Sequence, residues 1–158
     1  WHPGQDWILE PGGMGVFDPG INALSIATHL LPRSFALREA ELHTPDNRQA
    51  PLYARLAFVD TAGVPVTAEF DFLQSGQQCW DIEVETTVGI LMLSEGGATL
   101  SIDGQAQVVP ASSEYEGLYR RFVQLVRAGQ SEVDVAPFLH VADAFMLGAR
   151  KVAAPFAW

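Results

Sequence analysis

The chain has 158 residues, 48% of them hydrophobic, and this length and composition fit one globular domain with a sizeable core. Its formal net charge is −10, and the few basic residues are scattered, which excludes the basic face that nucleic-acid binding requires. No apolar run is long enough to cross a membrane, and the only cysteine, Cys79, excludes an internal disulfide, so we expect a soluble protein of a reducing compartment such as the cytoplasm.

The first 17 residues are rich in glycine, proline and tryptophan and show no apolar period, so we expect a loop. The chain begins at Trp1 and not at a methionine. We therefore expect a piece of a longer protein, with residues 1–17 forming a crossover loop from an upstream domain and residues 18–158 forming the folded domain.

A helix is predicted over residues 18–31. Asp18 is a typical N-cap residue, and Pro19 is typical of the first helical position. Apolar residues then recur at helical spacing. Pro32 ends the helix because proline disfavours helical backbone in the residue before it.

A long stretch after the first helix alternates apolar and polar residues, as is typical of strands with one apolar face. The predicted strands include residues 34–43, 52–58, 66–72, 80–85 and 88–94. Asp103-Gly104 lies between two further apolar segments and is a strong signal for a two-residue hairpin turn. We expect about six strands, paired mainly antiparallel.

Two helices are predicted after the strands. Ser113 and Glu116 form a capping-box pattern at the start of the first one. Asp134 can cap the second helix, and Arg150 and Lys151 suit its C-terminal end, where positive charge is favourable.

This order of elements predicts an α+β fold in which helices cover one face of a mainly antiparallel sheet. The opposite face is then solvated or paired with a partner. Residues 90–93 are apolar at every position, and the sequence leaves open whether this strand makes a subunit contact or lies in the core. Glu69 and Asp71 would repel a neighbouring acidic strand unless Arg38 and Arg55 offset them.

No residues complete a signature for a nucleotide, a metal ion or a hydrolytic triad. Gly12-Gly13-Met14-Gly15 lacks the preceding strand and the full glycine spacing of a dinucleotide loop, so we interpret it as a loop that allows close backbone approach. The four histidines are far apart in sequence, and we expect no structural metal. Cys79 lies in a strand pattern and is interpreted as a small apolar residue, not a nucleophile.

Asp18 and Asn22 are the strongest candidates for a binding site. Because they are four residues apart, they share one face of the predicted helix near its N-terminus. A carboxylate beside a carboxamide can accept from and donate to adjacent sugar hydroxyls, although both residues would also be ordinary as a helix cap and a surface residue. In the leading loop, His2 could add a hydrogen-bonding imidazole. Trp1 and Trp7 could stack on a pyranose ring, or they could simply anchor the loop.

Two stretches near the N-terminus carry a family resemblance. WHPGQ, from Trp1 to Gln5, and PGGMGVFDPGINALS, from Pro11 to Ser25, resemble the Gfo/Idh/MocA oxidoreductases, and more narrowly the aldose 1-dehydrogenases that act on D-galactose and L-arabinose. The segment from Leu139 to Gly148 is similar to the end of the same proteins. The resemblance covers essentially the whole chain and is most specific over residues 1–25.

The resemblance implies a two-domain enzyme. Its N-terminal Rossmann domain would bind NAD or NADP, and its C-terminal α+β domain would form a homo-oligomer, such as a dimer, through the open sheet face. An aldopyranose would lie between the domains and be oxidised at C1 to the lactone. Asp18 would then position or deprotonate the anomeric hydroxyl, and His2 and Asn22 would hold ring hydroxyls. The position of Asn22 is commonly histidine in the wider family, so a histidine acid/base role is in doubt there.

The Glu-Lys-Pro motif of the family, whose lysine touches the reacting hydroxyl, belongs to the N-terminal domain and does not occur in this sequence. We therefore expect this chain to be inactive by itself, and the cofactor to be bound mainly by the missing domain. Two alternatives stay open: a non-catalytic sugar-sensing or protein-interaction module of the same architecture, and a self-contained carbohydrate-binding domain.

Overall fold

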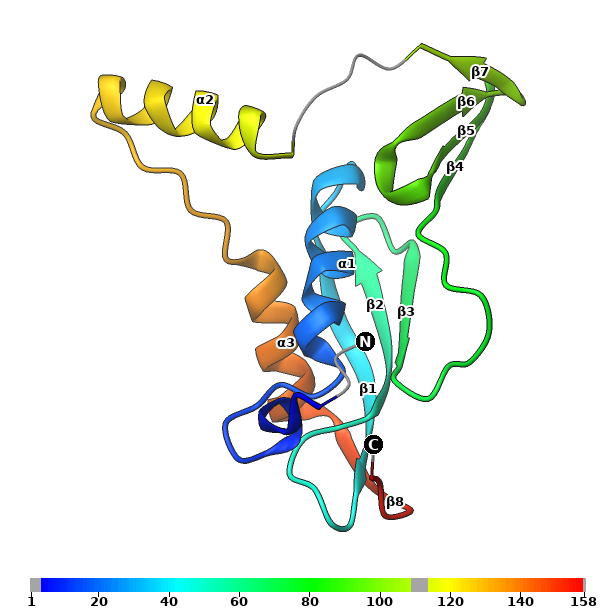
Figure 1. The fold of residues 1–158 in the computed structure, drawn as a ribbon, viewed down its shortest axis with the longest axis vertical. Coiled ribbons are helices and arrows are strands. Elements are labelled where there is room, and N and C mark those ends of the chain that lie inside the picture. Colours follow the sequence, from blue (N-terminus) through cyan, green and yellow to red (C-terminus); the bar gives the residue numbers. More distant parts are fainter. Residues whose placement is uncertain (1–3, 109–113, 158) are drawn as a thin grey trace. The chain divides into compact units, whose positions relative to one another are not determined.

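The structure is a computed structural model that describes residues 4–108 and 114–157. It divides into two compact units, one made of residues 1–74 and 133–158 and the other of residues 75–132. Each unit contains a four-stranded sheet (Figure 1). The predicted α+β class is confirmed. The strands, however, are shared between two sheets, whereas about six strands in one sheet were predicted.

The sheet of the first unit has the strand order β3-β2-β1-β8. Strands β1 (Phe35–Pro45), β2 (Tyr53–Asp60) and β3 (Pro65–Asp71) pair antiparallel, as their alternating sequence and hairpin links predicted. Strand β8 (Ala149–Ala153) pairs with β1 in the parallel direction. The sheet is therefore mainly antiparallel, with one parallel edge strand.

Two helices, α1 (Phe17–Leu30) and α3 (Ala136–Leu147), pack against each other and against one face of this sheet. A short 3-10 turn, η1 (Asp6–Leu9), precedes α1. The strands turn alanine, leucine and phenylalanine side chains toward the helices, and these residues form part of the buried core: Ala40, Leu42, Ala54, Leu56 and Phe58. Helices thus cover one face of the sheet, as predicted. Helix α1 ends at Leu30, two residues before Pro32.

The open face of the same sheet is polar. Cross-strand pairing aligns Glu41, Arg55 and Glu69 in one row, and His43, Tyr53 and Asp71 in the next. Arg55 therefore lies directly between two glutamates and can offset their charges. The acidic strand β4 belongs to the other sheet and does not pair with β3.

The second unit contains the antiparallel sheet β4-β5-β6-β7 and helix α2 (Glu114–Ala128). Its strands are β4 (Ile82–Thr86), β5 (Gly89–Ser94), β6 (Thr99–Ile102) and β7 (Gln105–Gln107), with the 3-10 turn η2 (Glu95–Gly97) between β5 and β6. Asp103 and Gly104 connect β6 to β7 with φ angles of 50° and 74°, as a type I′ hairpin turn requires. The predicted two-residue hairpin is therefore confirmed.

Strand β8 was not predicted. Arg150 and Lys151 were expected to extend the C-terminal end of the last helix, but Gly148 ends α3 and the next residues enter the sheet beside β1. A parallel partner that is distant in sequence leaves no local signal, because its pairing depends on the tertiary fold. Arg150 still acts on the helix end, since its Nη2 donates to the Phe145 carbonyl at 3.5 Å.

In the part of the chain that the structure describes, no helix has the length and apolar character needed to cross a bilayer.

Ser113 of the predicted capping box lies outside the described residues. Asp134 does accept the backbone N–H of Ala136 at 2.9 Å, although α3 begins after Val135.

Candidate functional site

The two predicted site residues Asp18 and Asn22 lie on the outward side of α1. They are one helical turn apart, opposite the side on which Phe17, Gly20 and Leu24 are buried. Asn22 is exposed and Asp18 is half-buried. The structure thus brings these two side chains to one face, as their spacing predicted.

The predicted N-cap role of Asp18 is wrong, because Asp18 is the second residue of α1 and Val16 is the cap. Backbone contacts from distant segments set this start: Gly15 N–H donates to the Ile8 carbonyl at 2.8 Å, and Val16 N–H donates to the Pro51 carbonyl at 2.7 Å. In the first turn, the Asp18 carboxylate lies where the helix dipole favours negative charge.

Aromatic packing fixes the buried side of α1 beneath the candidate site. The Phe17 ring contacts Phe70 of β3 and Phe145 of α3, with ring centroids 5.8 Å and 5.3 Å apart. Gly20 faces the Phe70 ring so closely that a Cβ atom there would lie 3.2 Å from it. The first turns of α1 are therefore held on the sheet, and the direction of Asp18 and Asn22 follows from that contact.

The polar face of α1 extends beyond the predicted pair. Ser25 and His29 continue the spacing at seven and eleven residues after Asp18, and both are exposed. The same helical spacing in the sequence could have identified them. The polar stripe of α1, defined as Asp18, Asn22, Ser25 and His29, offers a carboxylate, an amide, a hydroxyl and an imidazole along one face.

The leading segment runs into the N-terminal end of α1, where Asp18 and Asn22 lie. Trp1 and His2, both predicted to bind substrate, lie outside the described residues. Ile8 and Leu9 are fully buried and anchor the segment, whereas Trp7 is 58% exposed and does not. Trp7 therefore does not anchor the loop in the core of this unit, and its ring lies at the surface.

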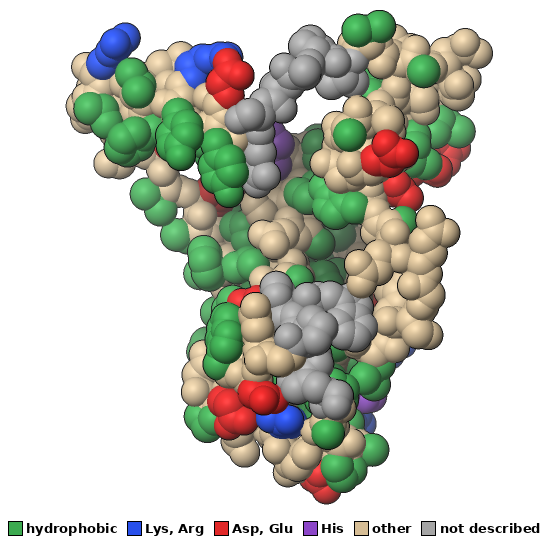
Figure 2. Space-filling model, in the orientation of Figure 1, with side chains coloured by type: hydrophobic (Ala, Val, Ile, Leu, Met, Phe, Trp, Pro, Cys, Tyr) green, Lys and Arg blue, Asp and Glu red, His purple; other side chains and the backbone are tan. Residues whose placement is uncertain are grey.

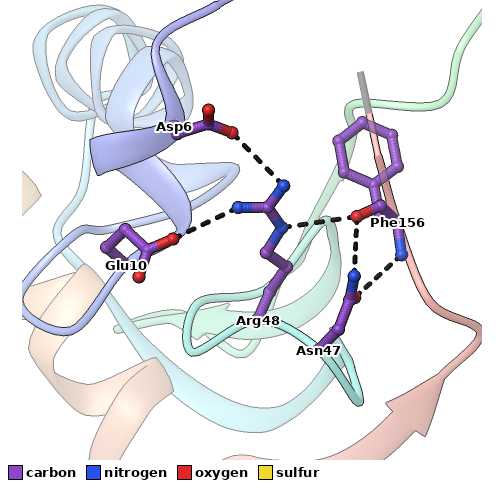
Figure 3. A network of polar contacts seen from close by, with 5 residues as sticks. All are labelled: Asp6, Glu10, Asn47, Arg48 and Phe156. Atoms are coloured by element: carbon purple, nitrogen blue, oxygen red, sulfur yellow. Dashed lines mark hydrogen bonds and ion pairs between the residues drawn. The ribbon is translucent and has the colours of Figure 1, made fainter.

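A polar network ties this segment to two other parts of the first unit (Figure 3). Arg48, in the connection between β1 and β2, forms ion pairs of 3.2 Å with Asp6 and with Glu10, and its Nε donates to the Phe156 carbonyl at 3.3 Å. Asn47 donates to that carbonyl and accepts the Phe156 N–H, both at 2.9 Å. The segment before α1, the β1–β2 connection and the C-terminal residues are thus joined at one point.

The glycine-rich run does not fit a nucleotide phosphate. Phosphate loops offer free backbone N–H groups, but Gly13 N–H donates to the Glu10 carbonyl and Gly15 N–H to the Ile8 carbonyl. A Cβ atom on Gly13 or Gly15 would lie 2.2 Å from a backbone oxygen. Close backbone approach, as predicted, is therefore what these glycines provide.

Neither His140 nor Cys79 extends the polar stripe of α1. His140 is buried, and its ring stacks on Phe35 with centroids 4.5 Å apart; burial lowers its pKa, against the opposing charges of Asp143 and Asp134. Cys79 is exposed in the connection before β4, not in a strand as predicted. Within the described residues, no group of three or more His, Cys, Asp or Glu side chains could hold a metal ion.

The open face of the first sheet has a separate hollow of about 560 Å³. Glu41, His43, Tyr53, Arg55 and Asp71 are among its lining residues. His43 Nε2 lies 2.6 Å from Glu41 Oε1, and this hydrogen bond lowers the pKa of Glu41. Desolvation, followed by a hydrogen bond with Glu69, raises the pKa of Tyr53. Because α1 packs on the opposite face of the sheet, this hollow is not part of the polar stripe.

Comparison with known proteins gives close relatives of about twice the length. Galactose 1-dehydrogenase from Pseudomonas fluorescens is 49% identical over 150 residues, which are 95% of this chain and 49% of that protein. The crystal structure of a D-galactose-1-dehydrogenase protein from Rhizobium etli is 57% identical, with a TM-score of 0.88 over 99% of this chain and 50% of that one. No protein-family model matches the chain.

A more distant structure has the same fold. KijD10, a 3-ketoreductase from Actinomadura kijaniata in complex with TDP-benzene and NADP, is 19% identical, with a TM-score of 0.67 over 90% of this chain and 49% of that one. In the galactose dehydrogenases the matching region is the C-terminal half. The chain therefore spans about half the length of the relatives that it matches.

Proposed function

We propose that this chain, which is homologous to the C-terminal half of galactose 1-dehydrogenase and has the fold of a Gfo/Idh/MocA-type oxidoreductase, is the substrate-binding half of an NAD(P)-dependent aldose 1-dehydrogenase. Its substrate is D-galactose or L-arabinose, which is oxidised at C1 to the lactone. By itself the chain is inactive. The observation that carries the proposal is the 57% identity to the Rhizobium etli protein over 99% of this chain.

The polar stripe of α1 supports a sugar site. Oxidation of an aldopyranose at C1 removes a hydride from carbon and a proton from the anomeric hydroxyl. Asp18 positions that hydroxyl or accepts its proton, since a half-buried carboxylate is a suitable acceptor. Asn22, one turn further on, holds a neighbouring ring hydroxyl with its amide, which can both donate and accept.

The leading segment completes the site in this proposal. His2 hydrogen-bonds a ring hydroxyl, and Trp1 supplies an apolar surface for the pyranose ring. The Arg48 network supports this arrangement, because it fixes the segment a few residues after His2. Residues 1–17 then serve as the crossover between the two domains, and residues 18–158 as the substrate-binding and oligomerisation domain.

The cofactor, NAD or NADP, is held by the N-terminal half of such an enzyme. The glycine-rich run of this chain is not its phosphate site, because the Gly13 and Gly15 amides donate to the chain's own carbonyls. The contribution of this chain is therefore to bind and orient the sugar and to hold the proton at O1. The expected location is the cytoplasm, where NAD and NADP are available and a free thiol such as that of Cys79 stays reduced.

The open sheet face is the proposed surface for homo-oligomerisation, most simply a dimer. A sheet covered by helices on one side leaves its second face for solvent or for a partner. Here that face alternates acidic and basic side chains across the strands, in the row Glu41, Arg55 and Glu69. Arranged about a two-fold axis, such a face can pair Arg55 of one copy with a carboxylate of the other.

A chimeric enzyme tests the proposed function directly. This chain would replace the C-terminal half of the Rhizobium etli protein, so that the N-terminal half supplies the nucleotide site. We expect galactose-dependent reduction of NAD or NADP by the chimera, and none by this chain alone. A folded chimera that oxidises neither D-galactose nor L-arabinose would contradict the proposal.

A further inference from the structure

Ser25 continues the polar stripe of α1 beyond the pair Asp18 and Asn22. It is exposed, and its side chain has no hydrogen-bond partner among the residues that the structure describes. Its backbone carbonyl accepts the Thr28 hydroxyl at 2.9 Å. A helix turns about 100° per residue, so Ser25 points within about 20° of the direction of Asp18. One ligand lying along α1 can therefore meet both side chains, with Asn22 between them.

The distances along α1 match the length of one sugar ring. With a rise of about 1.5 Å per residue, Asn22 lies about 6 Å, Ser25 about 10 Å and His29 about 16 Å beyond Asp18. The hydroxyls on C1 and C4 of a pyranose lie roughly 5–6 Å apart, and a hydrogen bond of about 2.8 Å at each end extends the reach to about 11 Å. A single pyranose whose C1 hydroxyl is held at Asp18 can thus reach Ser25, but not His29.

The side chains along α1 suit a neutral ligand. Within α1, which is described throughout, Asp18 is the only Asp, Glu, Lys or Arg residue. The visible surface along the helix is mainly that of hydrophobic and uncharged groups (Figure 2). A phosphate or carboxylate ligand would need basic partners, which this helix does not supply. The Ser25 hydroxyl, in contrast, can donate to one sugar hydroxyl and accept from another.

We propose that Ser25 is a specificity-determining residue that binds the hydroxyl on C4 of the substrate. The inference rests on the proposed function, in which Asp18 holds the C1 hydroxyl and Asn22 holds a neighbouring ring hydroxyl. A ring that runs from Asp18 toward Asn22 brings its far end to Ser25, and C4 is the ring carbon opposite C1. D-Galactose and L-arabinose have the same configuration at C4, so one serine serves both sugars. D-Glucose differs from D-galactose at C4 alone.

The hydroxymethyl group and the N-terminal half of the enzyme are the two other groups that the Ser25 hydroxyl could contact. The hydroxymethyl carbon, C6, is attached to C5, on the side of the ring opposite C2 and its hydroxyl. With the C2 hydroxyl at Asn22, C6 therefore points away from the line to Ser25. Ser25 also lies only about 4–5 Å along the helix from Asn22, so a ring bound at Asn22 occupies this space before a protein surface can.

Ser25→Ala in the chimeric enzyme with the Rhizobium etli N-terminal half tests the proposal. Alanine removes the hydroxyl and favours the helix, so the fold is retained. We expect kcat/KM to fall about three- to tenfold for both D-galactose and L-arabinose, the usual effect of losing one hydrogen bond between neutral groups. Ser34→Ala, at an exposed serine after α1, is the matched control and should leave kcat/KM unchanged.

Deoxy sugars identify the atom that Ser25 binds. With 4-deoxy-D-galactose, Ser25→Ala should cause no further loss of kcat/KM, because the hydrogen bond is already absent. With 2-deoxy-D-galactose, the loss caused by Ser25→Ala should remain three- to tenfold, since C4 keeps its hydroxyl.

Three results would overturn this inference and leave the proposed function standing. They are an unchanged kcat/KM in Ser25→Ala, a loss for D-galactose without one for L-arabinose, which indicates C6, and an equal loss for D-galactose and its 4-deoxy form, which indicates a contact with the N-terminal half. An unsubstituted chimera that oxidises neither sugar would instead contradict the proposed function itself, and this inference with it.

Discussion

Gly20 of α1 lies against the ring of Phe70 in β3, and a Cβ atom on Gly20 would come within 3.2–3.3 Å of three ring carbons. Only a residue without a side chain allows helix and sheet to approach this closely. The contact lies midway between Asp18 and Asn22, so it sets the height of the polar stripe above the sheet. Residue size at position 20 is therefore coupled to the geometry of the candidate site.

Enlarging residue 20 should destabilise the first unit. Gly20→Val forces the Phe70 ring away from α1, and overpacking of this kind costs about 1–3 kcal/mol. Urea unfolding followed by circular dichroism measures the loss. Ser25→Val, on the exposed side of the same helix, should change the midpoint little. If both variants unfold at the same urea concentration, the Gly20–Phe70 contact does not limit how closely α1 approaches the sheet.

Removal of the Arg48 guanidinium should loosen the segment before α1 and the C-terminal residues together. Arg48→Met retains much of the stem but loses both ion pairs and the hydrogen bond to the Phe156 carbonyl. Because Asp6 and Glu10 are more than half exposed, we expect a loss of only about 1–2 kcal/mol. Limited proteolysis should cut near both segments sooner, whereas Arg127→Met on the surface of α2 should not change the cleavage pattern. Unchanged cleavage in Arg48→Met would contradict the predicted role of the network.

His140 should make folding sensitive to mildly acidic pH. Burial lowers its pKa in the folded protein, and the unfolded chain takes up a proton near the ordinary value of 6.5. This contribution to stability is complete above pH 6.5, decreases as the pH falls through 6.5, and levels off below the folded-state pKa. His140→Phe keeps the ring between Phe35 and Phe58 and should flatten the free energy of unfolding between about pH 7 and 5. His29→Gln, at an exposed position, serves as the control. An unchanged pH dependence in His140→Phe would show that another group is responsible.

Reversing the charge of Arg55 should separate copies of the chain if the open sheet face is the oligomer surface. Arg55→Glu places three carboxylates in one cross-strand row, and like charges directly opposite each other are unfavourable. Sedimentation velocity should show monomers for this variant and dimers for Arg127→Glu, which makes the same charge change elsewhere. A dimer that persists in Arg55→Glu would exclude this face as the contact.

Much of the fold follows from local patterns in the sequence. Period-two alternation predicted most of the strands, and Asp103-Gly104 predicted its hairpin, because both signals depend on neighbouring residues. The first helix was predicted to within one residue at each end. Its start was misplaced because the amides of Gly15 and Val16 bind carbonyls of Ile8 and Pro51, and neither contact has a signature in the sequence.

Features that depend on distant segments could not be predicted in the same way. Strand β8 forms only where β1 is already in place beside it. Ile8 and Leu9 gave no periodic signal, yet they anchor the leading segment in the core. For the candidate site, helical spacing predicted that Asp18 and Asn22 share a face. The support beneath them from Phe17, Phe70 and Phe145 became visible only in the structure.

The central claim is that Asp18 acts on the anomeric hydroxyl of an aldose, and its most direct test is sugar oxidation by the chimeric enzyme carrying Asp18→Asn. Asparagine keeps the shape of the side chain but cannot accept a proton. Asp46→Asn, an identical change at an exposed loop position, is the matched control and should retain full activity. We expect kcat/KM for galactose to fall at least about 100-fold in Asp18→Asn, the usual contribution of a positioned acid or base. A value within the range of the control would contradict the account.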